Sequence, residues 1–559
     1  MKQKLVIATL AIAVAMLSAA DIQAQTYGGA VLDHDILMPA DIASLSKTQV
    51  FGTSRAMAMG GAFTSLGADM SSASINPAGL GMYSLEVFSF TPMISSANSS
   101  TVGTPSWVGN NKTSMSMANM GGVFKVTENA SGSLIAVNAA ITYNRVADYN
   151  TRMSFSKESL FDSSNGNYVP SINDVFMRQL DGGGIYPTDT SKTMEYDGNP
   201  YYWSAQSAYN TVLIDPESGN NGWTTNTIGY NASVLGSYEV LQSGRTDEYT
   251  FALGANIGNY LYMGATLGIH DIRQTTEYTY QEEYNYYDDD DYAYGSPSDT
   301  EPLSSQAIYS SLWQRTKLSG SGIDLKLGLI ARPTRAIRIG AAFHSPTYYN
   351  LARTYETSTE AKFWDNSDNT QFINTSLSPE FIDDYENSWS FRTPSKLLLG
   401  ASFQVGSVGL VAVDYERQWY NWMRVSSMPT GTGYSTYDYQ QTFEESYQPT
   451  NTLRVGIEVK PVATVALRAG GGFSTSMLTD EAQMYSTPLA TDSNYMTFGL
   501  GFQLSATTTF DLAYQYFHQN YSSYRLFYVE NGGEMLSASN LFNSSLDANY
   551  FTLTFTFRL

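Results

Sequence analysis

Apolar and polar residues alternate through residues 549–559, the last stretch of the chain. Side chains of a strand point to opposite faces in turn, so one face here would carry phenylalanine and leucine and the other threonine and Arg558. The same period of two recurs at 323–329, 453–460 and 497–504, where aliphatic or aromatic residues oppose glycine, polar and charged residues. An apolar face towards lipid and a polar face towards a lumen is the pattern of an outer-membrane barrel. In a soluble sandwich, the apolar face would instead pack against a second sheet.

The connections between the predicted strands distinguish an outer-membrane barrel from a soluble sandwich. About fourteen candidate strands lie near 85–97, 115–127, 132–157, 246–257, 260–283, 312–332, 336–358, 386–405, 407–426, 440–460, 464–478, 493–506, 508–528 and 548–559. Short turns alternate with long polar loops near 158–245, 284–311, 359–385, 427–439 and 479–492. Short turns on one side and long loops on the other are typical of outer-membrane barrels. We therefore predict an all-β fold, a transmembrane antiparallel β-barrel over residues 85–559, whose last strand closes against the first.

The N-terminal part of the chain has a different pattern. Residues 1–24 combine two early lysines, a short apolar run and a small residue before Gln25, which is typical of a cleaved secretory signal peptide. Residues 25–84 are rich in small residues and show no sustained alternation. We predict that this segment is a hatch that plugs the barrel. It is too short for the plug of a TonB-dependent receptor, so no TonB dependence is expected.

The composition of the chain excludes several kinds of site and partner. The chain has no cysteine, which excludes disulfides, thiolate metal sites and a cysteine nucleophile. The formal net charge of −22 argues against a nucleic-acid partner. Tyrosine, with 41 residues, suits the membrane–water boundary as well as β-strands in general. The four histidines and the many serines show no spacing typical of a hydrolase, so we expect no enzymatic activity, no cofactor and no metal site.

Several stretches resemble one family. The run 54–63 followed by Asn76-Pro77-Ala78-Gly79, the hairpin 322–346 and the strands at 394–417, 453–473 and 498–516 are similar to FadL/TodX channels. The resemblance implies a fourteen-stranded barrel with an N-terminal hatch, in the outer membrane of a Gram-negative bacterium. It also implies passive, hatch-gated uptake of long-chain fatty acids, aromatic hydrocarbons or similar lipophiles. In this family the ligand leaves sideways into the outer-membrane lipid through a kink in the third strand.

Two sets of residues are candidates for gating. Asn76, Pro77, Ala78 and Gly79 suit a type I turn, and this motif could serve equally as a rigid connection to the first strand or as a gate. In the predicted third strand, a polar interruption that includes Asn144, Asp148 and Asn150 breaks the apolar alternation. This interruption is the candidate lateral gate; the alternative, slightly favoured by the pattern, is that the strand leaves the membrane there.

Other candidates concern ligands and loops. Lys326, Arg338, Arg454 and Arg468 fall on the lumen face, where they could contact a fatty-acid carboxylate. Pairing with Asp324, Glu458 or Asp511 is the favoured alternative, because enclosed charges need partners. The acidic run 288–291 could hold a cation, but a solvated loop is favoured. Residues 203–214 could form a short amphipathic helix, in a ligand groove or in a small core under the long loop.

Two functions therefore follow from the sequence. The first is a channel for hydrophobic small molecules. The second is a surface-exposed binding or adhesion barrel that acts through its long loops while its pore stays closed. Fatty acids and hydrocarbons both remain open as ligands.

Overall fold

In the computed structural model, residues 25–559 are described except 33, 106–108, 129–131, 161–168, 191–192, 221, 226–231, 287–306, 365–371, 376–384, 407, 431–432, 483, 486 and 532–533. The predicted signal peptide, residues 1–24, and the acidic run 288–291 therefore lie outside the described residues. Within the described part of the chain, no helix is both long and apolar enough to cross a membrane.

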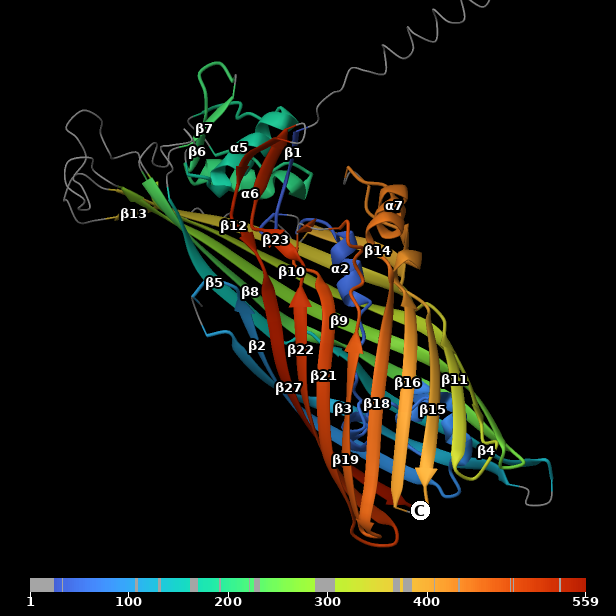
Figure 1. The fold of residues 1–559 in the computed structure, drawn as a ribbon. Helices are drawn as coiled ribbons and strands as arrows, with labels where there is room; N and C mark the ends of the chain where they lie inside the picture. Colours follow the sequence, from blue (N-terminus) through green and yellow to red (C-terminus); the bar gives the residue numbers. More distant parts are fainter. Residues whose placement is uncertain are drawn as a thin grey trace, which may run out of the picture.

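The chain forms a closed antiparallel barrel of fourteen strands, some of which are divided into shorter segments (Figure 1). The segments are β2 (Val87–Thr101), β3 (Asn111–Glu128), β4 (Leu134–Asp148), β5 (Thr151–Leu160), β8 (Ala232–Ile257), β9 (Leu261–Tyr286), β10 (Ala307–Ala331), β11 (Ile337–His344), β12 (Tyr348–Trp364), β13 (Phe372–Thr375), β14 (Tyr385–Arg392), β15 (Lys396–Val405), β16 (Gly409–Trp419), β17 (Arg424–Ser427), β18 (Pro449–Val462), β19 (Val465–Ser474), β21 (Ala490–Gln503), β22 (Thr508–Tyr521) and β27 (Ser544–Arg558). The predicted fold class is confirmed.

The last strand closes the barrel as predicted, because β27 pairs with β2 from Val87–Arg558 to Thr101–Ser544. The apolar face of each alternating segment points outwards. Leu453 and Ile457 on β18 keep 52% and 44% of their surfaces exposed, whereas their polar neighbour Glu458 is buried inside. The alternation along the sequence thus marks which side of the wall each residue occupies.

Two expectations about the long loops need correction. The predicted loop 158–245 is shorter, since β5 continues to Leu160 and β8 begins at Ala232. These strands extend towards the long-loop end, where Val234 and Tyr238 of β8 pack in one hydrophobic core with Phe155 of β5. The strand predicted at 440–460 begins later, because residues 436–446 form a helix, α7 (Thr436–Ser446), whose first turn is capped by Ser435.

The hatch segment runs down the inside of the barrel. It contains β1 (Gln25–Gly28), α2 (Pro39–Leu45), α3 (Ser54–Ala58), α4 (Ser72–Ile75) and the 3-10 helix η1 (Pro77–Met82). At the long-loop end, β1 pairs with β24 (Tyr528–Asn531), which pairs with β25 (Glu534–Ala538). Figure 1 shows β1 at this end beside α5 (Ile172–Gly183) and α2 inside the upper barrel.

Smaller elements cover the long-loop end. They are η2 (Pro200–Tyr202), α6 (Trp203–Asn210), β6 (Ile214–Pro216), β7 (Trp223–Thr225), η4 (Tyr420–Trp422), β20 (Met484–Tyr485), β23 (Ser523–Arg525) and β26 (Leu541–Phe542). The helix expected within 203–214 is confirmed as α6. Its Ala205 and Ala208 are buried in a core that also includes Phe176 of α5 and Phe527. This helix therefore belongs to a small core under the long loop.

Candidate functional site

The lower part of the hatch packs directly against glycines of the barrel wall. A Cβ at Gly328 would meet the side chain of Asn76, and one at Gly340 would meet the backbone of Thr64. Gly264 approaches Pro77 in the same way, and Gly456 approaches Met59. Glycine lets two backbones approach more closely than any other residue allows. The hatch between residues 54 and 82 therefore fits closely against the wall.

The Asn76-Pro77-Ala78-Gly79 motif lies within this contact. The Asn76 amide donates to the carbonyl of Thr64 at 2.6 Å, and to those of Leu329 and Ala341 at 3.3 Å. Its carbonyl oxygen accepts from the backbone N–H of Ala78, at the first turn of η1. The predicted turn is confirmed. The motif connects two parts of the hatch to two wall strands, and its role in gating stays a prediction.

Three wall carboxylates bind the hatch at separate points. Ser74 donates to Glu248 at 2.5 Å. The backbone N–H of Thr64 donates to Asp414 at 2.7 Å. Arg55 forms an ion pair with Glu458 at 3.1 Å. These contacts come from β8, β16 and β18, so the hatch is fixed on more than one side.

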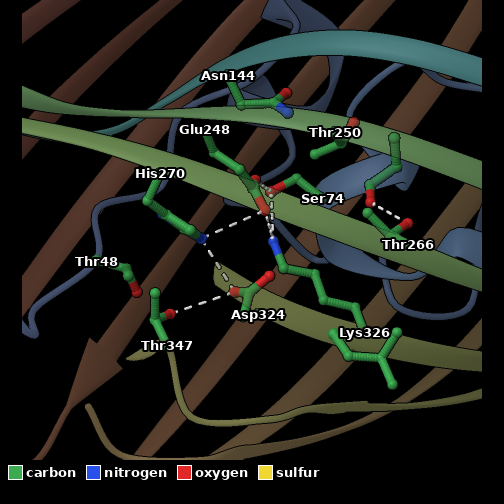
Figure 2. A network of polar contacts seen from close by, with 12 residues as sticks. Thr48, Ser74, Asn144, Glu248, Thr250, Thr266, His270, Asp324, Lys326 and Thr347 are labelled. Carbon is green, nitrogen blue, oxygen red and sulfur yellow. Dashed lines mark hydrogen bonds and ion pairs between the residues drawn. The ribbon is translucent and has the colours of Figure 1, made fainter. Parts of the chain in front are cut away.

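A buried polar network surrounds the first of these contacts (Figure 2). Lys326 is paired with Glu248, while His270 Nε2 lies 3.1 Å from Asp324 Oδ2 and 3.8 Å from Glu248 Oε1. Glu248, His270 and Asp324 bring potential metal-ligand atoms within 4.8 Å of one another. However, the Lys326 ammonium already supplies a positive charge to Glu248. The arrangement is therefore explained as an ion-pair network that joins three wall strands to the hatch.

The four cations predicted on the lumen face have different surroundings. Lys326 is paired as described, Arg454 lies 2.9 Å from Glu416, and Arg468 lies 2.7 Å from Glu458 and 2.6 Å from Asp511. Arg338 lines a groove at the short-turn end together with Arg55 and Glu458, the carboxylate that pairs with Arg468. The favoured alternative, structural pairing, thus describes Lys326, Arg454 and Arg468, and two of the three expected carboxylates are among their partners.

A central cavity of about 140 Å³ lies between the wall and hatch residues 45–51. Part of this stretch belongs to residues 46–53, the linker between α2 and α3, which we call the hatch linker. Across the linker lies a second space of about 60 Å³. A larger cavity of about 510 Å³ opens beside Arg55 and Tyr83 at the short-turn end. The hatch therefore lies between two upper spaces beside the linker and a lower one at the short-turn end.

The wall beside the central cavity contains a break in its hydrogen-bond ladder. Strands β3 and β4 pair from Glu128–Ala136 as far as Asn119–Asn144, and no further. At the other end of the break, the Asn110 amide donates to the Ser154 backbone carbonyl, and the Ser154 hydroxyl donates to the Asn110 side-chain oxygen. We call the stretch between these two contacts the wall gap.

The candidate gate residues lie together at the wall gap. Asn144 accepts a hydrogen bond from Asn119 at 2.6 Å. Asp148 accepts from Ser95 at 2.9 Å and from the Asn150 amide at 2.5 Å. Asn144 also lines the central cavity, so this cavity extends to the gap.

One hatch residue, Gln49, occupies the free edge of β4 at the wall gap. Its backbone N–H donates to the Val146 carbonyl at 2.9 Å, and its side-chain oxygen accepts from the Asp148 N–H at 2.8 Å. Its amide group also lies 3.3 Å from the Tyr550 hydroxyl. Gln49 therefore satisfies backbone groups of β4 that β3 does not reach. Sequence analysis missed this residue, because nothing in the local pattern shows that a distant strand edge lacks a partner.

A family model described as "Outer membrane protein transport protein (OMPP1/FadL/TodX)" matches residues 271–559, slightly more than half of the chain. No curated relative matches the sequence significantly.

Several solved structures are similar to this chain. A crystal structure of a Pseudomonas aeruginosa FadL homologue has 12% identity and a TM-score of 0.49, with 91% of this chain and 99% of that chain covered. The P. putida toluene transporter TodX has 12% identity and a TM-score of 0.47, with the same coverage. A CymD monoaromatic hydrocarbon channel has 11% identity and a TM-score of 0.45, with 91% and 97% covered.

Proposed function

Because the chain belongs to the outer membrane protein transport family (OMPP1/FadL/TodX), we propose that it is a passive channel for hydrophobic compounds. The compound enters from the long-loop side, reaches the central cavity and leaves through the wall gap into the lipid of the outer membrane. The hatch linker opens and closes this route. The transport includes no catalytic step.

This proposal rests on the wall gap and on Gln49, which binds the edge of β4 there. Elsewhere along β4, backbone groups that face β3 are paired with that strand. At Val146 and Asp148 their partner is the hatch linker. A backbone edge facing lipid without partners costs several kcal/mol, so an opening needs a replaceable partner. The hatch linker is such a partner, since it can move without breaking a pair of strands.

The remaining hatch contacts favour movement of the linker over expulsion of the hatch. Residues 54–82 contact wall glycines and three wall carboxylates. The linker contains no helix or strand. Moving it breaks a few hydrogen bonds, whereas displacing the whole hatch would break all of these contacts together. We therefore assign Asn76-Pro77-Ala78-Gly79 to anchoring.

Sideways exit also accounts for passive transport. A lipophile gains about 0.8 kcal/mol for each methylene group that leaves water for an apolar environment. An enclosed route from the outer surface to lipid lets the ligand follow this gradient without an energy source.

A disulfide across the closed gap tests the proposal. The chain has no cysteine, so Gln49→Cys with Val146→Cys creates a single possible pair. The backbone hydrogen bond between these residues brings their Cα atoms within about 4.4–6.8 Å, the range that a disulfide spans. We expect oxidation to abolish uptake of radiolabelled palmitate and toluene by cells that lack other lipophile channels, and reduction to restore it.

A second disulfide is the matched control. Ser54→Cys with Thr552→Cys joins the hatch to β27 at the anchored end of the linker, where the two native hydroxyl oxygens are 3.0 Å apart. Because residue 54 does not move in the proposed cycle, this variant should transport normally when oxidised. Undiminished uptake by the oxidised 49–146 pair would refute lateral exit through this gap. Absence of uptake even by the wild type would favour a barrel that acts through its loops.

A further inference from the structure

An apolar groove of about 470 Å³ lies on the outer face of the barrel wall, away from the hatch. It is lined by Leu453, Val455 and Ile457 of β18 and by residues 469–473 of β19. The three β18 side chains belong to the exposed, lipid-facing side of their strand. We call this hollow the outer groove.

The outer groove arises from the order of side-chain sizes along β19. Four residues of this strand point outwards, and the small pair Ala469 and Gly471 lies between the bulky pair Leu467 and Phe473. In the sheet, Ile457 and Val455 of β18 stand beside the small pair. On the other side stand the exposed side chains of Phe498 and Met496, on β21. The small pair therefore forms a hollow between larger apolar neighbours.

A cation lies above the outer groove, towards the long-loop end. Asn451 is the next outward residue beyond Leu453 on β18, and Arg417 of β16 stands opposite it. The Arg417 guanidinium donates from Nη1 to Asn451 Oδ1 at 3.0 Å. The Tyr415 hydroxyl donates to the same oxygen at 2.6 Å. Within the described part of the chain, Arg417 forms no ion pair with a carboxylate, so its charge is available to an anion.

Two stacked indole rings lie beyond this cation. Trp419 follows Arg417 by two residues and shares its face of β16. Its ring stacks on that of Trp422, with centroids 5.2 Å apart and planes at 11°. Trp422 is 52% exposed. Exposed indole rings are typical of the level at which lipid head groups lie.

The three features follow one another in the order of the parts of a lipid. The groove suits an acyl chain, the guanidinium a phosphate, and the exposed indole face a sugar ring. The groove alone gives little selectivity, because lipid tails are as apolar as its lining and contribute only packing contacts. Discrimination therefore has to come from the head group. A guanidinium suits this role, since it binds phosphate through two parallel, charge-assisted hydrogen bonds.

The position of Arg417 selects one leaflet of the membrane. The chain enters β18 at Pro449 directly after α7, which lies at the long-loop end (Figure 1). Long loops of outer-membrane barrels face the cell exterior. Arg417 therefore lies at the level of the outer leaflet, whose lipid in this membrane is lipopolysaccharide. Its membrane anchor, lipid A, is a phosphorylated disaccharide with several acyl chains.

We propose that the outer groove and Arg417 form a binding site for lipid A on the outside of the barrel, with one acyl chain in the groove and a phosphate on the guanidinium. The site depends on the chain belonging to an outer-membrane family and is independent of the channel function proposed above.

Native mass spectrometry of the detergent-solubilised, full-length protein tests the proposal. The probes are bisphosphorylated lipid A, the same lipid A without its phosphates, and phosphatidylglycerol. Loss of a charge-assisted hydrogen bond lowers affinity by about tenfold or more. We expect the wild type to bind bisphosphorylated lipid A at least about tenfold more tightly than the dephosphorylated form, and Arg417→Gln to remove this difference.

Further variants separate the acyl chain from the phosphate. Ala469→Leu fills the groove and should weaken both forms of lipid A by the same factor. Its control is Ala265→Leu, a lipid-facing position on β9 between the exposed Met263 and Leu267. The control for charge is Arg273→Gln, which removes a 64% exposed guanidinium of β9. Neither control should change binding, and heat-modifiable electrophoretic migration verifies that each barrel is folded.

Several results would overturn the proposal. Equal binding of the two forms of lipid A by the wild type would exclude phosphate recognition, whether or not Arg417→Gln folds. An equal loss in Arg273→Gln and Arg417→Gln would show general attraction to positive charge in place of a site. Phosphatidylglycerol that binds as tightly as lipid A would show that the site does not select lipid A.

Discussion

The closed state of the wall gap can be weakened by one substitution, Gln49→Ala. The alanine keeps the backbone hydrogen bond to Val146 but removes the side-chain oxygen that accepts from the Asp148 N–H. Asp148 is 8% exposed, so water has little access to that N–H while the gap is closed. The contact with the Tyr550 hydroxyl is lost as well.

The magnitude follows from the cost of a buried donor without an acceptor, about 1–3 kcal/mol. When the hatch linker moves away, the wild type loses the same hydrogen bond, so the substitution penalises only the closed state. The ratio of open to closed channels should therefore rise roughly 5–150-fold.

Thiol labelling measures this ratio directly. Val146→Cys places a cysteine on the edge that the linker covers, in a chain with no other thiol. In this background, Gln49→Ala should accelerate labelling by a water-soluble maleimide and increase lipophile uptake. Gln448→Ala is the control, since Gln448 donates to the Leu478 carbonyl away from the gap. Unchanged labelling and uptake in a folded Gln49→Ala protein would refute the argument that this side chain stabilises closure.

Two further predictions concern the hatch and the long loop. Gly340→Val should destabilise the packing of the hatch by about 1–3 kcal/mol, because the new side chain meets the Thr64 backbone. Faster proteolysis of the hatch would report this. Gly109→Val is the control and should not change the rate of proteolysis, since a Cβ at Gly109 has no neighbour within 4 Å. Glu282→Ala should weaken the attachment of α5 to the barrel, because this buried carboxylate accepts from Ser171 at 2.5 Å and from the backbone of Ile172 at 2.9 Å. Hydrogen exchange should increase in α5 but not in β18. Equal protection of α5 in the wild type and the variant would contradict this role.

The parts of the fold that were predicted correctly share one physical cause. Where a strand has lipid on one side and the lumen on the other, each residue's polarity must match its face, as in 453–460 and 549–559. The strand at residues 232–245 was missed for a different reason. Its Val234 and Tyr238 pack into the core under the long loop, so their burial depends on α5 and α6 and not on lipid.

The candidate site divides in a similar way. Asn144, Asp148 and Asn150 were found because a polar interruption is conspicuous within an alternating strand, and they do lie together at the wall gap. Lys326, Arg454 and Arg468 were correctly placed on the inner face, yet each has a carboxylate partner from another strand.

The sequence by itself therefore determined the barrel, the orientation of its faces and the position of the hatch, because these follow from the solvent that each residue meets. Only the tertiary structure decided which backbone edge is left open and that Gln49 fills it. These properties arise from contacts between residues that are far apart in the chain, and the local sequence pattern does not predict such contacts.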